Sequence, residues 1–195
     1  LFGRGMIHLE KDRYAPETSL AATVLSETPG HLSSSPASTP NRLDTPLEIA
    51  VLCRPEPILA PSPRIRNDQL EEPIYALTPS EKRAILTAVR LRDEAGKGSR
   101  VRLLACGDHH IEDALREGLS LGADTALFVN WPTAFPEPAD VSQALASSLE
   151  DPNEIPQIIL SGSTTSGTSP ILALFAGHLK IPYQDEAHSI ELVEG

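Results

Sequence analysis

Two histidines stand side by side in the segment Cys106-Gly107-Asp108-His109-His110, between an apolar run and an amphipathic one. Imidazole and carboxylate groups are common zinc ligands and common catalytic acids and bases. Zinc-binding histidine pairs usually stand four positions apart, and neighbouring residues on a helix diverge by about 100°. We therefore predict no metal site here, and interpret His109 and His110 as polar residues at the start of a helix beside a ligand cleft.

The two cysteines, Cys53 and Cys106, each end an apolar run and form no Cys-x-x-Cys motif. A catalytic thiol needs a neighbouring base and an activating charge. The favoured interpretation is that both are small buried thiols lining the cleft. Because the sequence contains no evident acid–base pair or nucleophile–base set, we predict that the chain has no catalytic residues of its own.

A loop rich in glycine and hydroxyl groups, "SGSTTSGTS", precedes a helix predicted to start at Pro170. Such a loop offers backbone N–H groups and the positive end of a helix dipole to an anion. The dipole contributes only ~0.3–1 kcal/mol, so several N–H and hydroxyl bonds would have to hold a phosphate. The loop lacks the lysine of a P-loop and the spacing of a Gly-x-Gly-x-x-Gly motif. A plain surface loop with good helix capping is an equal alternative.

Composition narrows the class of protein. The 195 residues include 27 acidic and 16 basic ones, giving a net charge of −11 with no cluster of Lys and Arg. This argues against nucleic acid and against an anionic membrane surface as partners. No apolar run approaches the ~18 residues of a membrane-spanning helix, so we predict no direct membrane insertion. The amino-terminal residues contain no apolar signal region, which favours the cytoplasm or a matrix-like compartment.

Three regions are predicted. Residues 1–25 form an arm, either disordered or ordered against a partner, and residues 26–46 form a linker rich in serine and proline. Residues 47–195 form an α/β domain, in which strands at 47–53, 101–106, 125–129, 157–160 and 190–193 alternate with helices. The helices begin at Thr78, Asp108, Asp140 and Pro170. This alternation predicts a mostly parallel sheet with helices on both faces, of the Rossmann-like, adenine-nucleotide-binding type.

Ligands of such sheets bind beyond the carboxyl ends of the strands. Four stretches are expected at that edge: residues 53–54, 78–80, 106–110 and 161–169.

Several motifs occur in an order that resembles the beta subunit family of electron transfer flavoproteins. They are "EIAVLCRPEP", "PRIRND", "LTPSEKRAILTAVRLRDE", "LLACGDHHIEDALREGLSLGADTALFV" and "PQIILSG" followed by "AGHLKIPY". The resemblance covers residues 47–193 and is closest in the fourth motif. It identifies the chain as a divergent member with an amino-terminal extension and a shortened carboxyl-terminal end.

The resemblance implies a heteromer with an alpha-like subunit, in which this chain holds AMP, or FAD as in electron-bifurcating members, near a flavin on the partner. Carried over by position, the nucleotide-binding residues would be Leu52, Thr78, Pro79, Ser80, Glu81, Cys106, Gly162, Ser163, Gly167, Thr168, Ser169 and Gly177.

The loop departs from the family pattern, because it is shorter and lacks the acidic stretch and the Gln-Thr-Gly-Gln-like signature. Arg54, Thr78 and Ser80 replace the family's lysine, asparagine and aromatic residue. Two functions therefore stay open. One is a nucleotide-holding subunit of an electron transfer flavoprotein system. The other is an accessory subunit of a larger respiratory or redox complex, in which the nucleotide site has decayed and no nucleotide is bound. In that case the chain would associate with a membrane only through the complex, and residues 1–46 would serve as a tether.

Overall fold

The computed structural model describes residues 6–10, 46–58, 65–66, 69–70, 74–131, 137–149, 155–162, 170–185, 187 and 189–192. Their main element is a five-stranded sheet in the order β1-β8-β7-β2-β9. β2 (Glu48–Cys53), β7 (Arg100–Gly107), β8 (Thr125–Asn130) and β9 (Ile158–Ser161) are parallel to one another. β1 (Met6–Glu10) pairs antiparallel with β8 at one edge.

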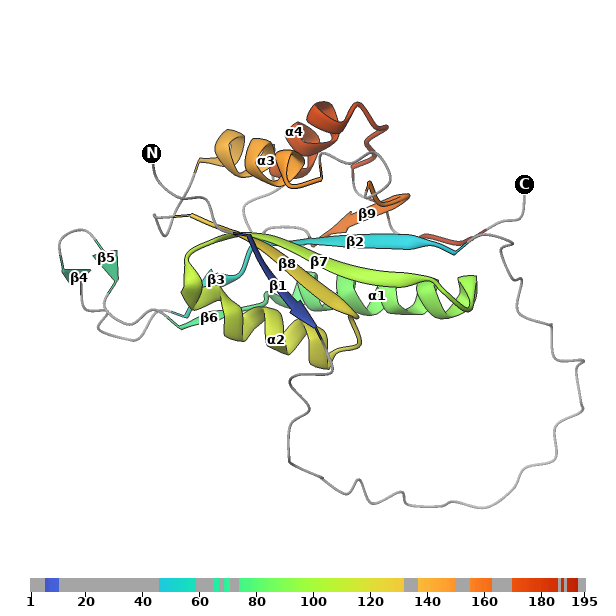
Figure 1. Ribbon diagram of the computed structural model, residues 1–195, viewed down its shortest axis with the longest axis horizontal. Helices are drawn as coiled ribbons and strands as arrows, with labels where there is room; N and C mark the ends of the chain where they lie inside the picture. The colour runs from blue at the N-terminus through green and yellow to red at the C-terminus, as the bar shows by residue number, and fades with distance from the viewer. Residues whose placement is uncertain are drawn as a thin grey trace, which may run out of the picture.

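Helices cover both faces of this sheet (Figure 1). α1 (Pro79–Ala95) and α2 (Glu112–Ser120), which follows the 3-10 turn η2 (His109–Ile111), lie on one face. α3 (Pro138–Ser147) and α4 (Pro170–Leu179) lie on the other. The strands alternate their side chains between two cores, so that Val51 and Leu103 pack under α1 while Leu104 packs under α3 and α4. The predicted mostly parallel, Rossmann-like α/β fold is confirmed.

The start of α1 follows from its local sequence, as predicted. Thr78 is the N-cap, and its side-chain oxygen accepts from the Glu81 N–H while the Glu81 side chain binds the Thr78 backbone, forming a capping box. Pro79 occupies the first turn, where its missing N–H has no cost. Gly96 ends the helix at a φ of 94°, which favours glycine.

Three local predictions were wrong. α3 begins at Pro138 rather than Asp140, because the proline fixes a helical φ at the first position and draws Asp140 into the first turn. Residues 190–192 form no strand. Instead, Ile190 and Leu192 pack against the core beneath α1, and the Arg90 guanidinium donates to the Ile190 carbonyl at 2.8 Å. Strand β1 was not predicted.

The excursion between β2 and α1 contains two small strand pairs. β3 (Glu56–Pro57) pairs with β6 (Tyr75–Ala76), and β4 (Ile65–Arg66) pairs with β5 (Gln69–Leu70). The predicted linker at 26–46 lies outside the described residues except for Pro46, and so does most of the predicted arm. Within the described part of the chain, no helix combines the length and apolar character needed to cross a bilayer.

Candidate functional site

The order in which strands are added to the sheet reverses at β2. From β2 the chain adds β7 and then β8 on one side, and it returns to place β9 on the other side. The helices change face at the same step, from α1 and α2 to α3 and α4 (Figure 1). The carboxyl ends of β2 and β9 therefore form a topological switch point, the usual ligand position in open α/β sheets. Leu52 stands opposite Ser161 in the register there.

A buried carboxylate fixes the start of α1 against the end of β2. Glu81 is only 5% exposed. Its Oε2 accepts from the Thr78 N–H at 2.7 Å and the Thr78 hydroxyl at 2.8 Å, and its Oε1 accepts from the Arg54 N–H. Backbone N–H donors of this kind compensate a carboxylate that has lost its water. Because both carboxylate oxygens accept hydrogen bonds within the fold, Glu81 positions the start of α1 against the end of β2.

The Cys53 thiol faces this same carboxylate from β2. Cys53 is 2% exposed, and burial first, with the charge of Glu81 second, raises its pKa well above the usual value. A thiol of raised pKa is a poor nucleophile. The prediction that Cys53 is buried is confirmed. Cys106 is half-buried and packs on the opposite face of the sheet, towards α3 and α4.

The chain leaving β9 passes directly over the first turn of α1. A Cβ atom built on Gly162 would lie 2.5 Å from the backbone nitrogen of Glu81 and 2.7 Å from the carbonyl carbon of Ser80. Only a residue without a side chain fits there. The close contact brings Gly162 together with Ser80 and Glu81, as the prediction of one shared edge requires. The direct backbone contact between Gly162 and α1 was not predicted. The only feature of the sequence that indicates it is the isolated glycine at the end of the predicted strand.

The predicted nucleotide-binding residues fall into three groups. The structure places Leu52, Thr78, Pro79, Ser80, Glu81 and Gly162 around the switch point, with Cys106 one strand away on β7. Gly177 is exposed on α4, about two turns beyond the helix start, with open space around it. Ser163, Gly167, Thr168 and Ser169 lie outside the described residues.

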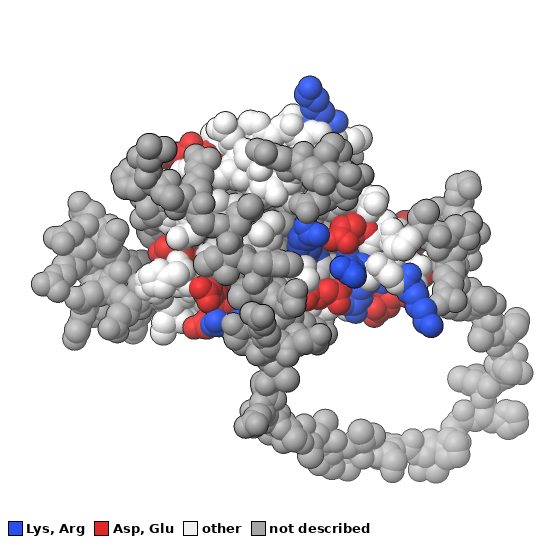
Figure 2. Space-filling view, in the orientation of Figure 1, with Lys and Arg blue, Asp and Glu red and all other residues white. Residues whose placement is uncertain are grey.

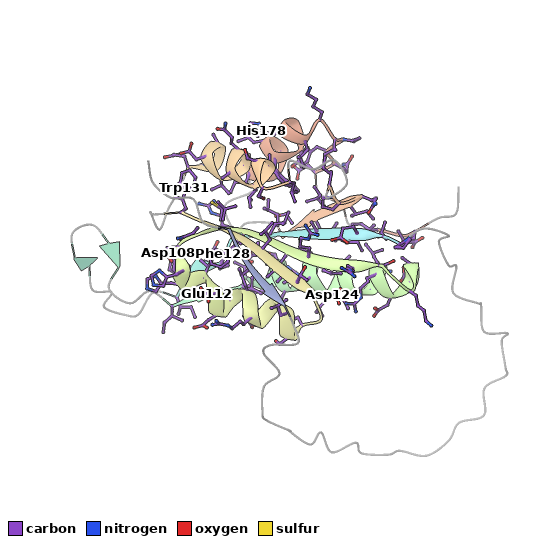
Figure 3. The ribbon with its side chains drawn as sticks, viewed as in Figure 1. Asp108, Glu112, Asp124, Phe128, Trp131 and His178 are labelled. Carbon is purple, nitrogen blue, oxygen red and sulfur yellow. The ribbon has the colours of Figure 1, made fainter. Side chains whose placement is uncertain are left out.

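The two histidines lie differently from the prediction. Asp108 caps the turn as expected, since its Oδ1 accepts from the His110 N–H at 2.9 Å. However, the imidazole rings do not diverge. Their centroids are 3.9 Å apart with the planes tilted by 35°. The 3-10 turn separates neighbouring residues by about 120°, so it is the side-chain rotamers that bring the two rings together. Figure 3 shows Asp108 at one end of the sheet, in the part of the molecule occupied by α2.

Charged side chains on the visible face are mixed rather than segregated by sign (Figure 2). Several form ion pairs between elements, including Arg92 with Asp124 at 3.1 Å and Lys82 with Glu117 at 2.5 Å. Arg92 also holds the turn that follows α2, because its guanidinium donates to the Gly122 carbonyl at 2.7 Å.

An open, mostly parallel sheet with helices on both faces and a topological switch point defines a Rossmann-like α/β protein. A sequence model described as the electron transfer flavoprotein domain matches residues 71–195, so the chain belongs to that family. It is also 30% identical over 121 residues to the electron transfer flavoprotein subunit beta of Syntrophomonas wolfei subsp. wolfei. That match covers 61% of this chain but 46% of the relative, so the chain spans about half of that relative's length.

Proposed function

We propose that this chain holds an adenine nucleotide, AMP or FAD, at the switch point between β2 and β9. In this proposal it acts as the beta-like subunit of an electron transfer flavoprotein system, beside a flavin on an alpha-like partner chain. The observation that carries the proposal is the meeting of Leu52, the capped start of α1 and Gly162 at one edge. The family and the name of the bacterial relative support it.

The donor groups at this edge fit an adenylate. The start of α1 presents the positive end of a helix dipole, and the Thr78 and Ser80 hydroxyls lie 3.0 Å apart beside it. Gly162 touches the first turn directly, so a phosphate would lie beside this contact. Leu52 contributes the end of β2, and its side chain remains in the apolar core. A bound flavin would supply the redox chemistry, while this chain would bind and orient.

The same contact favours a second candidate function. Because the backbone of Gly162 fills the space against the first turn of α1, part of the switch point is occupied by the chain itself. In that case the domain serves as a non-catalytic accessory subunit of a larger redox complex, and no nucleotide is needed. Under either proposal we expect the protein in the cytoplasm or the mitochondrial matrix, with any membrane contact made through its partners.

Nucleotide analysis of the purified full chain separates the two. We expect AMP or FAD in the extract of the denatured protein, and saturable binding of the added nucleotide by calorimetry. Ser80→Ala should weaken this binding about 2- to 12-fold, the equivalent of one hydrogen bond of 0.5–1.5 kcal/mol. Ser120→Ala, which removes a hydroxyl from the end of α2, is the matched control. An empty extract together with no binding would refute the nucleotide proposal and leave the accessory function.

Purification of the native assembly tests the partner. The first proposal expects an alpha-like chain carrying FAD in a fixed ratio. Recovery in a larger complex without that chain would support the accessory function.

A further inference from the structure

A cluster of metal-ligand groups lies outside the proposed nucleotide contacts, at the carboxyl end of β7. Asp108, His109 and His110 each offer one donor atom, and the three atoms lie within 4.8 Å of one another. We propose that this cluster binds a divalent transition-metal ion such as Zn²⁺, Ni²⁺ or Co²⁺. The inference does not rest on nucleotide binding, because none of its three residues is among the nucleotide contacts.

The carboxylate orients one imidazole for this role. Asp108 Oδ1 lies 3.1 Å from Nδ1 of His110, and it accepts from the backbone N–H of the same residue. An Nδ1–H donated to a carboxylate leaves the lone pair of a neutral imidazole on Nε2. Carboxylate–histidine pairs of this kind support metal sites because they fix both the tautomer and the ring.

The second imidazole is held beside the first and remains accessible. His109 is exposed, its ring stacks on that of His110 at 3.9 Å, and within the described part of the chain its ring nitrogens form no hydrogen bond. Its nitrogen atoms are therefore available to a ligand. Two imidazoles fixed in contact need little further ordering before they share an ion, which reduces the entropic cost of binding.

The carboxylate charge also lacks a permanent counter-ion. Among the described residues, the only ion pair of Asp108 is the one with His110. The charge acts on its surroundings, because burial first and Asp108 second raise the pKa of Tyr75. The Tyr75 hydroxyl is itself buried with no hydrogen-bond partner in the described structure. A cation at this position would neutralise a charge that forms no ion pair with a Lys or Arg of the described residues.

One effect opposes the ion. Asp108 caps the start of a helix, where the dipole disfavours positive charge by ~0.3–1 kcal/mol. Two imidazole ligands outweigh a term of this size, because each supplies a direct bond to the ion, while the Asp108 carboxylate orients His110 and adds its negative charge. The net charge of −11 also favours cations in general. Imidazole ligands select zinc, nickel, cobalt or copper over magnesium and calcium, which prefer oxygen.

The test titrates the nucleotide-free full chain with NiCl₂ by calorimetry and with CoCl₂ by visible absorption. We expect one site that shows the d–d bands of protein-bound Co²⁺. His109→Ala and His110→Ala should each raise the Kd at least ~10-fold, and Asp108→Asn about 10- to 100-fold, the usual cost of losing an orienting carboxylate. Asn is also a good N-cap, so Asp108→Asn removes the charge while it preserves the helix start. Circular dichroism verifies the fold of each variant.

His178→Ala is the matched control, because this exposed histidine stands alone in the last turn of α4, in the other helix layer (Figure 3). The Kd of the His178→Ala protein for the metal ion should stay within about twofold of the parent value, well below the effect of a lost orienting group. The proposal is overturned if folded His109→Ala and His110→Ala proteins bind as tightly as the parent. It is also overturned if the control loses as much affinity, or if no Co²⁺ bands appear.

Discussion

The contact between Gly162 and α1 allows a quantitative test by a single methyl group. In Gly162→Ala, the new Cβ would meet the Glu81 nitrogen at 2.5 Å, the Ser80 carbonyl carbon at 2.7 Å and the Glu81 Cα at 2.9 Å. All three are backbone atoms of the first turn of α1, which the capping box and the bond from Arg54 hold in place. No side chain can rotate away, so the loop after β9 or the helix start must shift.

Overpacking of this kind costs about 1–3 kcal/mol. With a urea dependence of about 2 kcal/mol per molar, a loss of 2 kcal/mol lowers the unfolding midpoint by about 1 M. Urea unfolding followed by circular dichroism measures this change. Because Gly162 and Ser80 both border the proposed site, a shift of either segment should also weaken nucleotide binding in the folded variant.

Gly177→Ala is the control, because a Cβ at this exposed helical position meets no atom within 4 Å. Alanine is the better helix former, so this variant should be as stable as the parent or more stable by up to about 1 kcal/mol. If Gly162→Ala unfolds at the same urea concentration as the parent while Gly177→Ala behaves as expected, the close approach of β9 to α1 is refuted.

Three further predictions concern the surroundings of the site. Glu81→Gln should lower the free energy of unfolding by about 1–3 kcal/mol, because an amide nitrogen replaces a buried acceptor; an unchanged urea midpoint would contradict this. Cys53 should react more slowly with iodoacetamide than the less buried Cys106, as peptide mass spectrometry will show. Because folding raises the Cys53 pKa, the unfolded chain loses its proton first and stability should fall above about pH 9, with a smaller fall in Cys53→Ala. Asp124→Ala should cost about 1–2 kcal/mol in urea unfolding, since its carboxylate accepts from the Val101 N–H and from a guanidinium. Asp93→Ala, at an exposed ion pair, should cost under about 0.5 kcal/mol.

The features predicted correctly from sequence are those that depend on residues close along the chain. Thr78 caps α1, which immediately follows it, and Asp108 caps the turn that immediately follows it. Apolar runs bounded by turn residues also identified the parallel strands. In each case the information lies within one or two turns of chain.

The features that were missed depend on contacts between distant segments. β1 has no helical or strand period of its own, and forms by pairing with β8, whose partner residues lie more than a hundred positions away. Residues 190–192 resemble a strand in composition but lie beneath α1, where Arg90 binds the Ile190 carbonyl. No sequence period encodes either choice, because the decisive partner is remote.

The stacking of His109 on His110 was missed for a different reason. The expected divergence considered only the backbone, and the 3-10 turn by itself separates neighbouring residues even more, by about 120°. The side-chain rotamers nevertheless bring the two rings into contact. Spacing arguments against a metal site therefore hold only where the rotamers are known.

The residues of the switch point do not all discriminate between a nucleotide-binding subunit and an accessory one. Gly162 and Glu81 are required by the packing itself, because one permits contact with α1 and the other joins α1 to β2. Both would be needed even if no nucleotide ever bound. Ser80 differs, since the capping box forms between Thr78 and Glu81 and does not include the Ser80 hydroxyl. A Ser80→Ala protein that keeps its stability but loses nucleotide affinity would therefore identify binding as the function of this edge, whereas an effect on stability alone would assign the hydroxyl to the fold.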